Sequence, residues 1–239
     1  MPINIGATSA TGQVIGGNEC AREGLVMWLD AGDVRSADQS GTGWNDMSGH
    51  DNDMTGNNVE AADLASGYWS PDGTNEYWSN TGFLDPTDDD DFSVECWLQL
   101  GSTNELGGII VQGKQGNSWG ICRSTSATVN FAVRGDTNRQ ASSGTLTAST
   151  WYHIAGTYND SHVTKIYVDG AEAASVDGDP GTVSTTENFY IGYKDSTSGS
   201  SASMKYFDGI LGIVRVYNRT LSASEVLYNF HSERSRYGK

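Results

Sequence analysis

The stretch Phe92-Ser-Val-Glu-Cys-Trp-Leu-Gln-Leu100 decides the fold class of this chain. Starting at Phe92, every second residue is apolar, whereas the residues between them are Ser, Glu, Trp and Gln. Successive side chains of a β-strand point to opposite faces. The pattern therefore predicts a strand with one wholly apolar face and one mixed face, as in a strand that contributes to the core of a layered β fold.

Similar short apolar runs recur along the chain, separated by clusters of Gly, Asp, Asn and Ser, which is typical of an antiparallel sandwich or barrel. Besides residues 92–100, the predicted strands are 25–30, 76–80, 108–114, 118–124, 128–135, 151–159, 162–168, 188–193 and 208–217. No two strands are separated by a helical pattern of the kind found in βαβ units, so a parallel sheet is not expected.

Two local patterns predict a hairpin and a helix. Asp169-Gly170 lies between two strand-like runs, and Asp-Gly suits a type I′ turn because both central residues need positive φ. Ser222 and Glu225 have the spacing of a capping box, in which each side chain satisfies a backbone donor of the other residue. An apolar stripe at helical spacing follows, so a short C-terminal helix is expected.

The composition excludes several classes of protein. The chain has 239 residues, which suits one all-β domain, and 14 Lys plus Arg against 30 Asp plus Glu give a net charge of −16. Nucleic-acid binding is not expected, because contacts with phosphates need clustered basic residues. A membrane span is not expected either, because no apolar run approaches about 20 residues. In the first 100 residues Arg22 and Arg35 are the only basic side chains, so the excess negative charge lies there.

The three cysteines are Cys20, Cys96 and Cys122, and none has a C-x-x-C spacing. The N-terminus lacks a basic region followed by a continuous apolar stretch, so no signal peptide is predicted. Synthesis in a reducing cytoplasm is therefore expected. We predict a flexible N-terminal arm over residues 1–20, one domain over 21–231 and a basic tail over 232–239.

Acidic residues in the first half of the chain suggest a calcium site. Hard oxygen donors cluster after Trp44, and they suit Ca²⁺, which prefers carboxylate and amide oxygens. The candidate ligands there are Asp46, Asp51, Asn52 and Asp53. Asp30 and Asp208 join the predicted metal site if the first and last strands pair. The alternative is that Asp46 and Ser48 only hold a turn through bonds to the backbone.

No catalytic set stands out. Glycoside hydrolysis needs two carboxylates that face one cleft, whereas Glu95 is the only acid on its predicted strand face. His153 lies in the middle of a predicted strand and is expected to be a hydrogen-bonded core residue. No nucleophile motif is present. An enzyme is therefore not expected.

Aromatic residues beside polar loops are the candidates for sugar binding, because aromatic faces stack on sugars. The remaining tryptophans, Trp28, Trp97 and Trp151, lie in predicted strands, and we expect them to pack in the core. The predicted carbohydrate-binding residues are Trp44, Trp69, Trp78 and Trp119.

Several segments together resemble the laminin-G-like (concanavalin A-like) jelly roll, in the order of that family and over roughly residues 24–230. The segments are Gly24-Leu-Val-Met-Trp-Leu-Asp, Trp44-Asn-Asp-Met-Ser-Gly, Phe92-Ser-Val-Glu-Cys-Trp, Trp151-Tyr-His-Ile-Ala-Gly-Thr-Tyr, Ile166-Tyr-Val-Asp-Gly, Tyr190-Ile-Gly and Phe207-Asp-Gly-Ile-Leu-Gly-Ile-Val-Arg-Val-Tyr. The resemblance implies an all-β fold, a two-sheet antiparallel jelly-roll sandwich. It also implies binding of Ca²⁺ and sugars at the loop rim near Asp46.

The ending Leu221-Ser-Ala-Ser-Glu-Val-Leu-Tyr-Asn-Phe-His is similar to tails of such domains in tailed-phage virion proteins. This resemblance implies a non-enzymatic protein on the virion surface of a bacterial virus, made in the host cytoplasm, that decorates the capsid or tail or binds a host glycan. The N-terminal arm is then expected to dock on capsid or tail proteins. A free calcium-dependent lectin is the alternative, a glycoside hydrolase ranks third, and homo-oligomerisation stays open.

Overall fold

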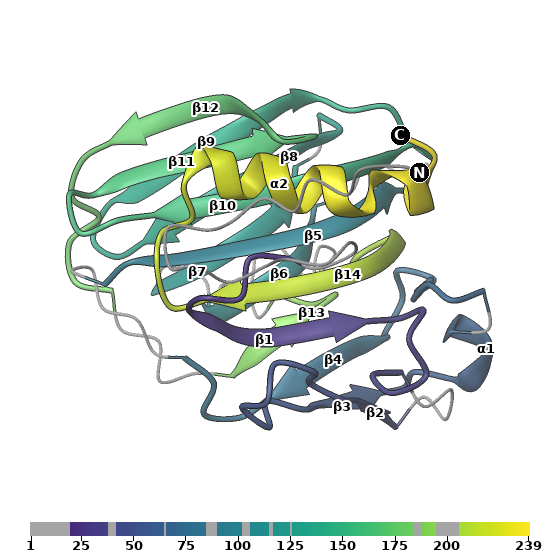
Figure 1. Cartoon of the computed structure of the whole chain (residues 1–239). Coiled ribbons are helices and arrows are strands. Elements are labelled where there is room, and N and C mark those ends of the chain that lie inside the picture. The colour runs from purple at the N-terminus through teal and green to yellow at the C-terminus, as the bar shows by residue number, and fades with distance from the viewer. Residues whose placement is uncertain are drawn as a thin grey trace, which may run out of the picture.

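The computed structural model of the chain describes residues 20–37, 42–64, 66–84, 90–101, 106–114, 117–124, 126–183, 188–194 and 206–239. In this part of the chain two antiparallel sheets pack face to face, and one helix lies against the outer side of one of them (Figure 1). The predicted all-β, two-sheet jelly-roll sandwich with a short C-terminal helix is thereby confirmed.

The first sheet has six strands in the order β1-β14-β5-β10-β11-β12. Its strands are β1 (Leu25–Asp30), β14 (Gly209–Tyr217), β5 (Phe92–Leu100), β10 (Trp151–Tyr158), β11 (Val163–Val168) and β12 (Ala171–Asp177). The hairpin between β11 and β12 confirms the predicted turn, since Asp169 and Gly170 have φ of 49° and 80°.

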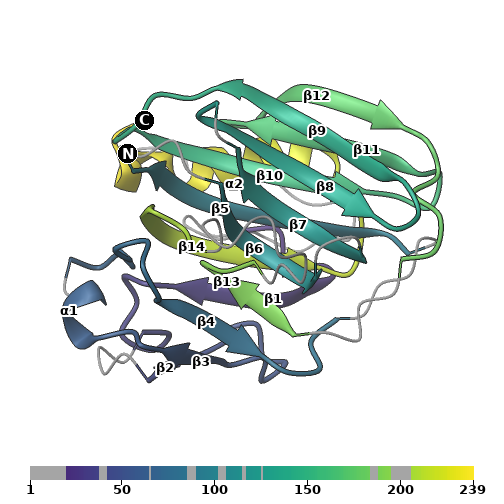
Figure 2. The same cartoon turned by 180° about the vertical axis from the view of Figure 1, so that it is seen from behind.

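The second sheet has eight strands in the order β2-β3-β4-β13-β6-β7-β8-β9. In Figure 2 this sheet faces the viewer. Its strands are β2 (Gly43–Trp44), β3 (Met54–Asn57), β4 (Tyr77–Asn80), β13 (Phe189–Ile191), β6 (Gly107–Lys114), β7 (Asn117–Arg123), β8 (Thr128–Arg134) and β9 (Asn138–Thr145). A short helix, α1 (Ala61–Leu64), lies between β3 and β4 in the chain.

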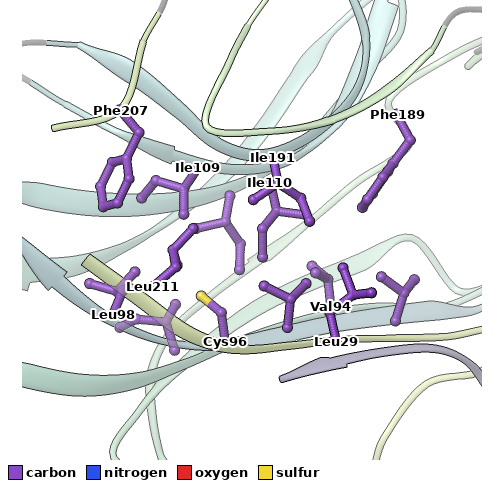
Figure 3. Close-up of a cluster of buried hydrophobic side chains, with 14 of the residues drawn as sticks. Leu29, Val94, Cys96, Leu98, Ile109, Ile110, Phe189, Ile191, Phe207 and Leu211 are labelled. Carbon is purple, nitrogen blue, oxygen red and sulfur yellow. The ribbon is translucent and has the colours of Figure 1, made fainter. Parts of the chain in front are cut away.

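The main core fills the space between the sheets. As the alternation in β5 predicts, Val94, Cys96 and Leu98 point into it and meet Ile110 and Ile191 from the other sheet (Figure 3). These side chains are almost completely buried, and burial of a large aliphatic side chain stabilises the fold by roughly 1.5–3 kcal/mol.

The outer face of the six-stranded sheet is covered by α2 (Ala223–Glu233) and by the 3₁₀-helix η1 (Arg234–Tyr237). The predicted capping box begins α2: the Ser222 side chain accepts from the Glu225 backbone, and the Glu225 side chain accepts from the Ser222 backbone. The mixed face of β5 packs under this cover, where Trp97 stacks on Tyr237 with ring centroids 4.2 Å apart.

The C-terminal residues 232–239 are part of the packed domain, which differs from the predicted separate tail. Arg236 pairs with Asp30 at 2.7 Å, and Lys239 pairs with Asp169 at 2.6 Å. Tyr237 is buried against the sheet. The positive charges of this segment are used to attach it to β1 and to the β11–β12 turn. Cys20, predicted to belong to the arm, is buried, while residues 1–19 lie outside the described part of the chain.

Among the described residues, no helix is both long and apolar enough to span a bilayer.

Candidate functional site

The four tryptophans predicted to be exposed sugar-binding residues are buried, so that prediction is wrong. Trp44, Trp69 and Trp78 are 0% exposed and pack on one another inside the sandwich, with ring centroids 5.4–6.4 Å apart. Trp119 is 1% exposed and packs on Phe92. Trp78 and Trp119 lie within strands β4 and β7, where their polar neighbours Ser79 and Ser118 point to the other face while the rings point inward. Of the tryptophans predicted for the core, Trp97 is buried, and Trp28 and Trp151 are half-buried.

On the outer face of the eight-stranded sheet, four tyrosine rings pack together above the buried tryptophans. Tyr193 stacks on Tyr77 with ring centroids 4.8 Å apart, and it lies 5.0 Å from Tyr190 and 5.3 Å from Tyr206. All four side chains are half-buried. We call Tyr77, Tyr190, Tyr193 and Tyr206 the tyrosine cluster.

The alternation of β4 and β13 sets the direction of these rings. Trp78 on β4 points into the core, so the neighbouring Tyr77 points outward. Phe189 and Ile191 on β13 point inward, so Tyr190 between them points outward. Because Tyr190 is opposite Ser79 in the ladder, Tyr77 is its diagonal neighbour, and diagonal aromatic pairs are within contact distance.

A tight backbone turn brings the other two rings to the same place. Gly192 has φ of 84°, and a Cβ at this position would overlap the Trp69 ring, so both the conformation and the space require glycine. Tyr193 then forms an isolated bridge with Tyr206. Since Trp69 and Trp78 pack tightly beneath the turn, the tyrosine cluster has a rigid base.

Polar groups flank the tyrosine cluster on the β3 side. Asn57 lies opposite Tyr77 in the ladder, and its amide donates to the Ser79 hydroxyl at 2.9 Å. Ser79 in turn lies opposite both Thr55 and Tyr190. Hydroxyl and amide groups beside aromatic rings are the combination that can orient a bound sugar.

Two basic side chains lie on the other side of the tyrosine cluster: Lys194 next to it in the chain, and Arg134 further across the sheet on β8, three strands from β13. Lys194 directly follows Tyr193 and is half-buried. Burial lowers the pKa of its ammonium group, nearby Cys122 raises it, and nearby Arg134 lowers it. The guanidinium group of Arg134 donates to the neutral side chains of Asn138 and Gln140, each at 3.1 Å.

None of the residues in the eight strands of this sheet is acidic, although the chain has 30 Asp and Glu. Its strands contain only basic charges, at Lys114, Arg123, Arg134 and Arg139. The strands of this sheet therefore contain no carboxylate pair of the kind that glycoside hydrolysis requires.

The predicted calcium ligand Asp46 is a turn-forming residue in this structure. Its carboxylate accepts from the backbone of Trp28 and Ser48, both at 2.8 Å, from the Ser48 hydroxyl at 2.7 Å and from the backbone of Asn52 at 3.1 Å. Asp53 accepts from the Asp46 backbone at 2.7 Å. These contacts support the alternative interpretation, in which Asp46 and Ser48 hold the turn beside β1.

The other predicted ligands do not join Asp46 around a common point. Strands β1 and β14 do pair, but Asp30 is bound by Arg236, and the Asp208 carboxylate lies against Gly101. Asp51 is exposed, and the Asn52 amide donates to the Val26 carbonyl at 2.7 Å. In the part of the chain that the structure describes, no group of three or more His, Cys, Asp and Glu is arranged to hold a metal ion. These residues do not fit a Ca²⁺ site in this arrangement.

Glu95, considered as a catalytic acid, is buried beneath α2. Its carboxylate accepts from Arg215 at 2.8 Å and from the Asn229 amide of α2 at 3.0 and 3.1 Å. His153 Nε2 lies 3.4 Å from it. Burial alone would raise the pKa of Glu95, but the contacts with His153 and Arg215 lower it to about 2. Arg215 also pairs with Glu233 of α2.

This network attaches α2 to the sheet. Glu95 is 1% exposed and His153 is 0% exposed, so neither side chain can reach a substrate in this conformation. The expectation that His153 is a core residue is confirmed. The network also holds the start of the described chain, because the Ala21 backbone donates to Asn229 at 2.8 Å.

Comparison with known proteins agrees with this architecture. The Concanavalin A-like lectin/glucanases superfamily matches residues 72–227, and the chain therefore belongs to this superfamily. No curated protein sequence was found to be similar to the chain.

Three solved structures illustrate the likeness in fold. The binding domain of Paraclostridial Mosquitocidal Protein 1 has a TM-score of 0.60 at 14% identity, covering 88% of this chain and 52% of that one. Botulinum neurotoxin type C, whose cell entry is described as dependent on interaction with two ganglioside molecules, has a TM-score of 0.62 at 13% identity, covering 88% and 51%. Trypanosoma rangeli sialidase in complex with sialic acid has a TM-score of 0.64 at 17% identity, covering 96% and 36%. The chain thus spans about half of each toxin chain and about a third of the sialidase chain.

Proposed function

We propose that this protein is a non-enzymatic carbohydrate-binding module whose sugar-binding surface is the tyrosine cluster. The observation that carries the proposal is the packing of four half-buried tyrosine rings on the outer face of a sheet, with ring centroids of neighbouring pairs 4.8–6.2 Å apart. Tyrosine offers a sugar an apolar ring face and a hydroxyl group at a small entropic cost. The rigid tryptophan layer beneath it reduces the cost of ordering further.

Two further observations support this proposal. Botulinum neurotoxin type C and the sialidase share the fold and are described with a ganglioside and with sialic acid, both of which are carbohydrate ligands. The sialidase also raises an enzymatic alternative. The non-enzymatic form of the proposal is supported by the burial of Glu95 and by the lack of acidic residues in the strands that carry the tyrosine cluster.

A glycan-array screen of the purified protein tests the proposal. We expect retention of a restricted set of glycans and no release of sugar from any of them. Binding of no glycan would contradict the proposal, and release of reducing sugar would favour the enzymatic alternative. Calcium dependence stays a prediction from the sequence, and the same screen in EDTA tests it: a signal that persists without calcium would agree with the turn role of Asp46.

We propose further that this module works on the virion surface of a bacterial virus, with residues 1–20 docked on a capsid or tail protein. The resemblance of the segment after Leu221 to virion proteins supports this proposal. Deletion of residues 2–19, which keeps the buried Cys20, should then abolish incorporation into particles and leave glycan binding intact. Unchanged incorporation of the shortened chain would count against the docking role.

A further inference from the structure

We propose that the surface at the tyrosine cluster selects acidic saccharides, through Lys194 and Arg134 acting on a carboxylate or sulfate group of the sugar. This inference rests on the proposed function and adds the chemical class of the ligand.

The first step concerns the surroundings of Lys194 within the described part of the chain. Its side chain is half-buried, directly follows Tyr193 of the tyrosine cluster in the chain, and lies with its Cβ against Gly108 of β6. Within the described part of the chain, the charged groups that act on Lys194 are Cys122 and Arg134, and no carboxylate is among them. A partly buried ammonium group without an anionic partner is unfavourable, and an anionic ligand would relieve that cost.

The second step concerns Arg134, which lies on β8 with its side chain on the outer face. Its partners at 3.1 Å are the amide oxygens of Asn138 and Gln140, which orient the guanidinium group without neutralising it. An oriented guanidinium group binds carboxylates and sulfates through parallel hydrogen bonds.

The third step is the distribution of charge over the whole molecule. The chain has a net charge of −16, yet the eight strands of this sheet contain basic residues and no acidic residue. In such an acidic protein most of the surface repels an anion, and strands without carboxylates are where an anion can approach. The same repulsion elsewhere directs an acidic ligand to this face.

The tyrosine cluster and the two cations thus divide the recognition of one ligand. The rings provide stacking area for the sugar ring, which acidic and neutral sugars share. The cations add an interaction that only an acidic sugar can make, so they determine selectivity rather than binding as such.

The test compares matched pairs of glycans on one array, each pair differing only in the acidic group. Suitable pairs are sialyllactose with lactose, oligogalacturonate with its methyl ester, and a sulfated disaccharide with its desulfated form. Wild-type protein should prefer the acidic member of at least one pair by about tenfold or more, because hydrogen bonds to charged groups are stronger than those between neutral groups. The preference should fall as sodium chloride is added.

Two substitutions separate selectivity from binding. Lys194→Gln and Arg134→Gln should reduce binding of the acidic glycan to the level of its neutral partner. Lys165→Gln is the matched control, since it removes one positive charge from the six-stranded sheet, where Lys165 pairs with Glu172 at 2.8 Å. This control should leave the preference unchanged.

Cys122 offers a second readout close to the site. It is half-buried, whereas Cys20 and Cys96 are buried, so an alkylating reagent should modify Cys122 first. The acidic glycan should slow this modification in the wild-type protein and not in Lys194→Gln.

The outcomes are distinguishable. Equal binding of acidic and neutral partners, or an unchanged preference in both Lys194→Gln and Arg134→Gln, would overturn this inference while the carbohydrate-binding function stands. Binding of no glycan in any pair would overturn the proposed function, and the inference with it.

Discussion

At the scale of single residues, several charged groups of this protein hold the fold together. Glu95, Arg215 and Glu233 form a buried network between β5, β14 and α2. Buried charges are tolerated only when they are paired and hydrogen-bonded. This explains how a glutamate can be buried on a central strand of the sandwich.

Replacing Glu95 by Gln should destabilise the protein, because the buried guanidinium group of Arg215 loses one of its two carboxylates. Breaking a buried ion pair in this way costs about 3–5 kcal/mol. The measurement is the free energy of unfolding in urea at pH 7. A loss below about 1 kcal/mol, within the range of exposed pairs, would contradict this role.

The low pKa of Glu95 predicts a loss of stability in acid. Its pKa lies at about 2 in the folded protein, below the ordinary value of 4.5, so its contribution is present above pH 4.5 and is lost as the pH falls towards 2. The melting temperature of Glu95→Gln should therefore fall less steeply over this range than that of the wild type. Parallel curves would contradict the prediction.

Glu76 should make the protein less stable as the pH rises towards 7, whereas Glu95 makes it less stable as the pH falls. Burial and the nearby carboxylates of Asp63 and Asp72 raise its pKa to about 7, although it accepts from the Asp72 backbone. The folded state therefore binds an extra proton between pH 4.5 and 7, and stability falls as the pH rises through that range. Glu76→Gln keeps an acceptor oxygen and should be insensitive to this change. A melting temperature of the wild type that stays constant from pH 5 to 8 would contradict this prediction.

At the scale of elements, α2 depends on its capping box as well as on the buried network. The Ser222 hydroxyl donates to Glu225 at 2.8 Å and accepts from the Glu225 backbone at 3.3 Å. Ser222→Ala should reduce stability by about 1 kcal/mol, the usual value of an N-cap side chain. Chemical denaturation checks this, and Ser224→Ala, two residues further on, is the control that should have a smaller effect, because it removes the 3.0 Å contact between the two hydroxyls but leaves the capping box in place. Equal losses in the two variants would argue against the cap.

The strands show where sequence pattern is informative. Predicted and observed bounds agree for 25–30, a continuous apolar run between Gly24 and Asp30, and for 92–100, where apolar residues alternate with a clear period. Strands β3 and β9 were not predicted: Met-Thr-Gly-Asn and Asn-Arg-Gln-Ala-Ser-Ser-Gly-Thr each bury a single residue. Such strands form because a neighbouring strand provides backbone hydrogen-bond partners. This is a tertiary effect, so local sequence propensity does not predict it.

At the scale of the whole molecule, the tyrosine cluster depends on sheet order rather than on local sequence. Its rings come from β4, from the end of β13 and from the segment before β14, and they meet because β4 and β13 are adjacent. The sequence offers one signal, the tyrosine between Phe189 and Ile191, which alternation assigns to the outer face. Which strand lies beside it cannot be deduced from that pattern.

The predicted exposure of the tryptophans shows an error that arises from reading local sequence alone. Trp69 and Trp78 lie next to polar residues, which suggested exposure, but the polar neighbours face solvent while the rings fill the space between the sheets. Large aromatic side chains contribute most to the stability of a fold when they are buried. The polar composition of a segment therefore does not determine where its aromatic rings point, because the packing of the two sheets decides it.

The central claim is that the tyrosine cluster binds the glycan, and isothermal titration with the best glycan from the array tests it most directly. Tyr193 contacts each of the other three rings, so Tyr193→Ala should weaken binding at least about tenfold, as loss of a central aromatic contact does. Tyr228→Ala, on α2 over the opposite sheet, should bind like the wild type. Full affinity of a folded Tyr193→Ala protein would contradict the account.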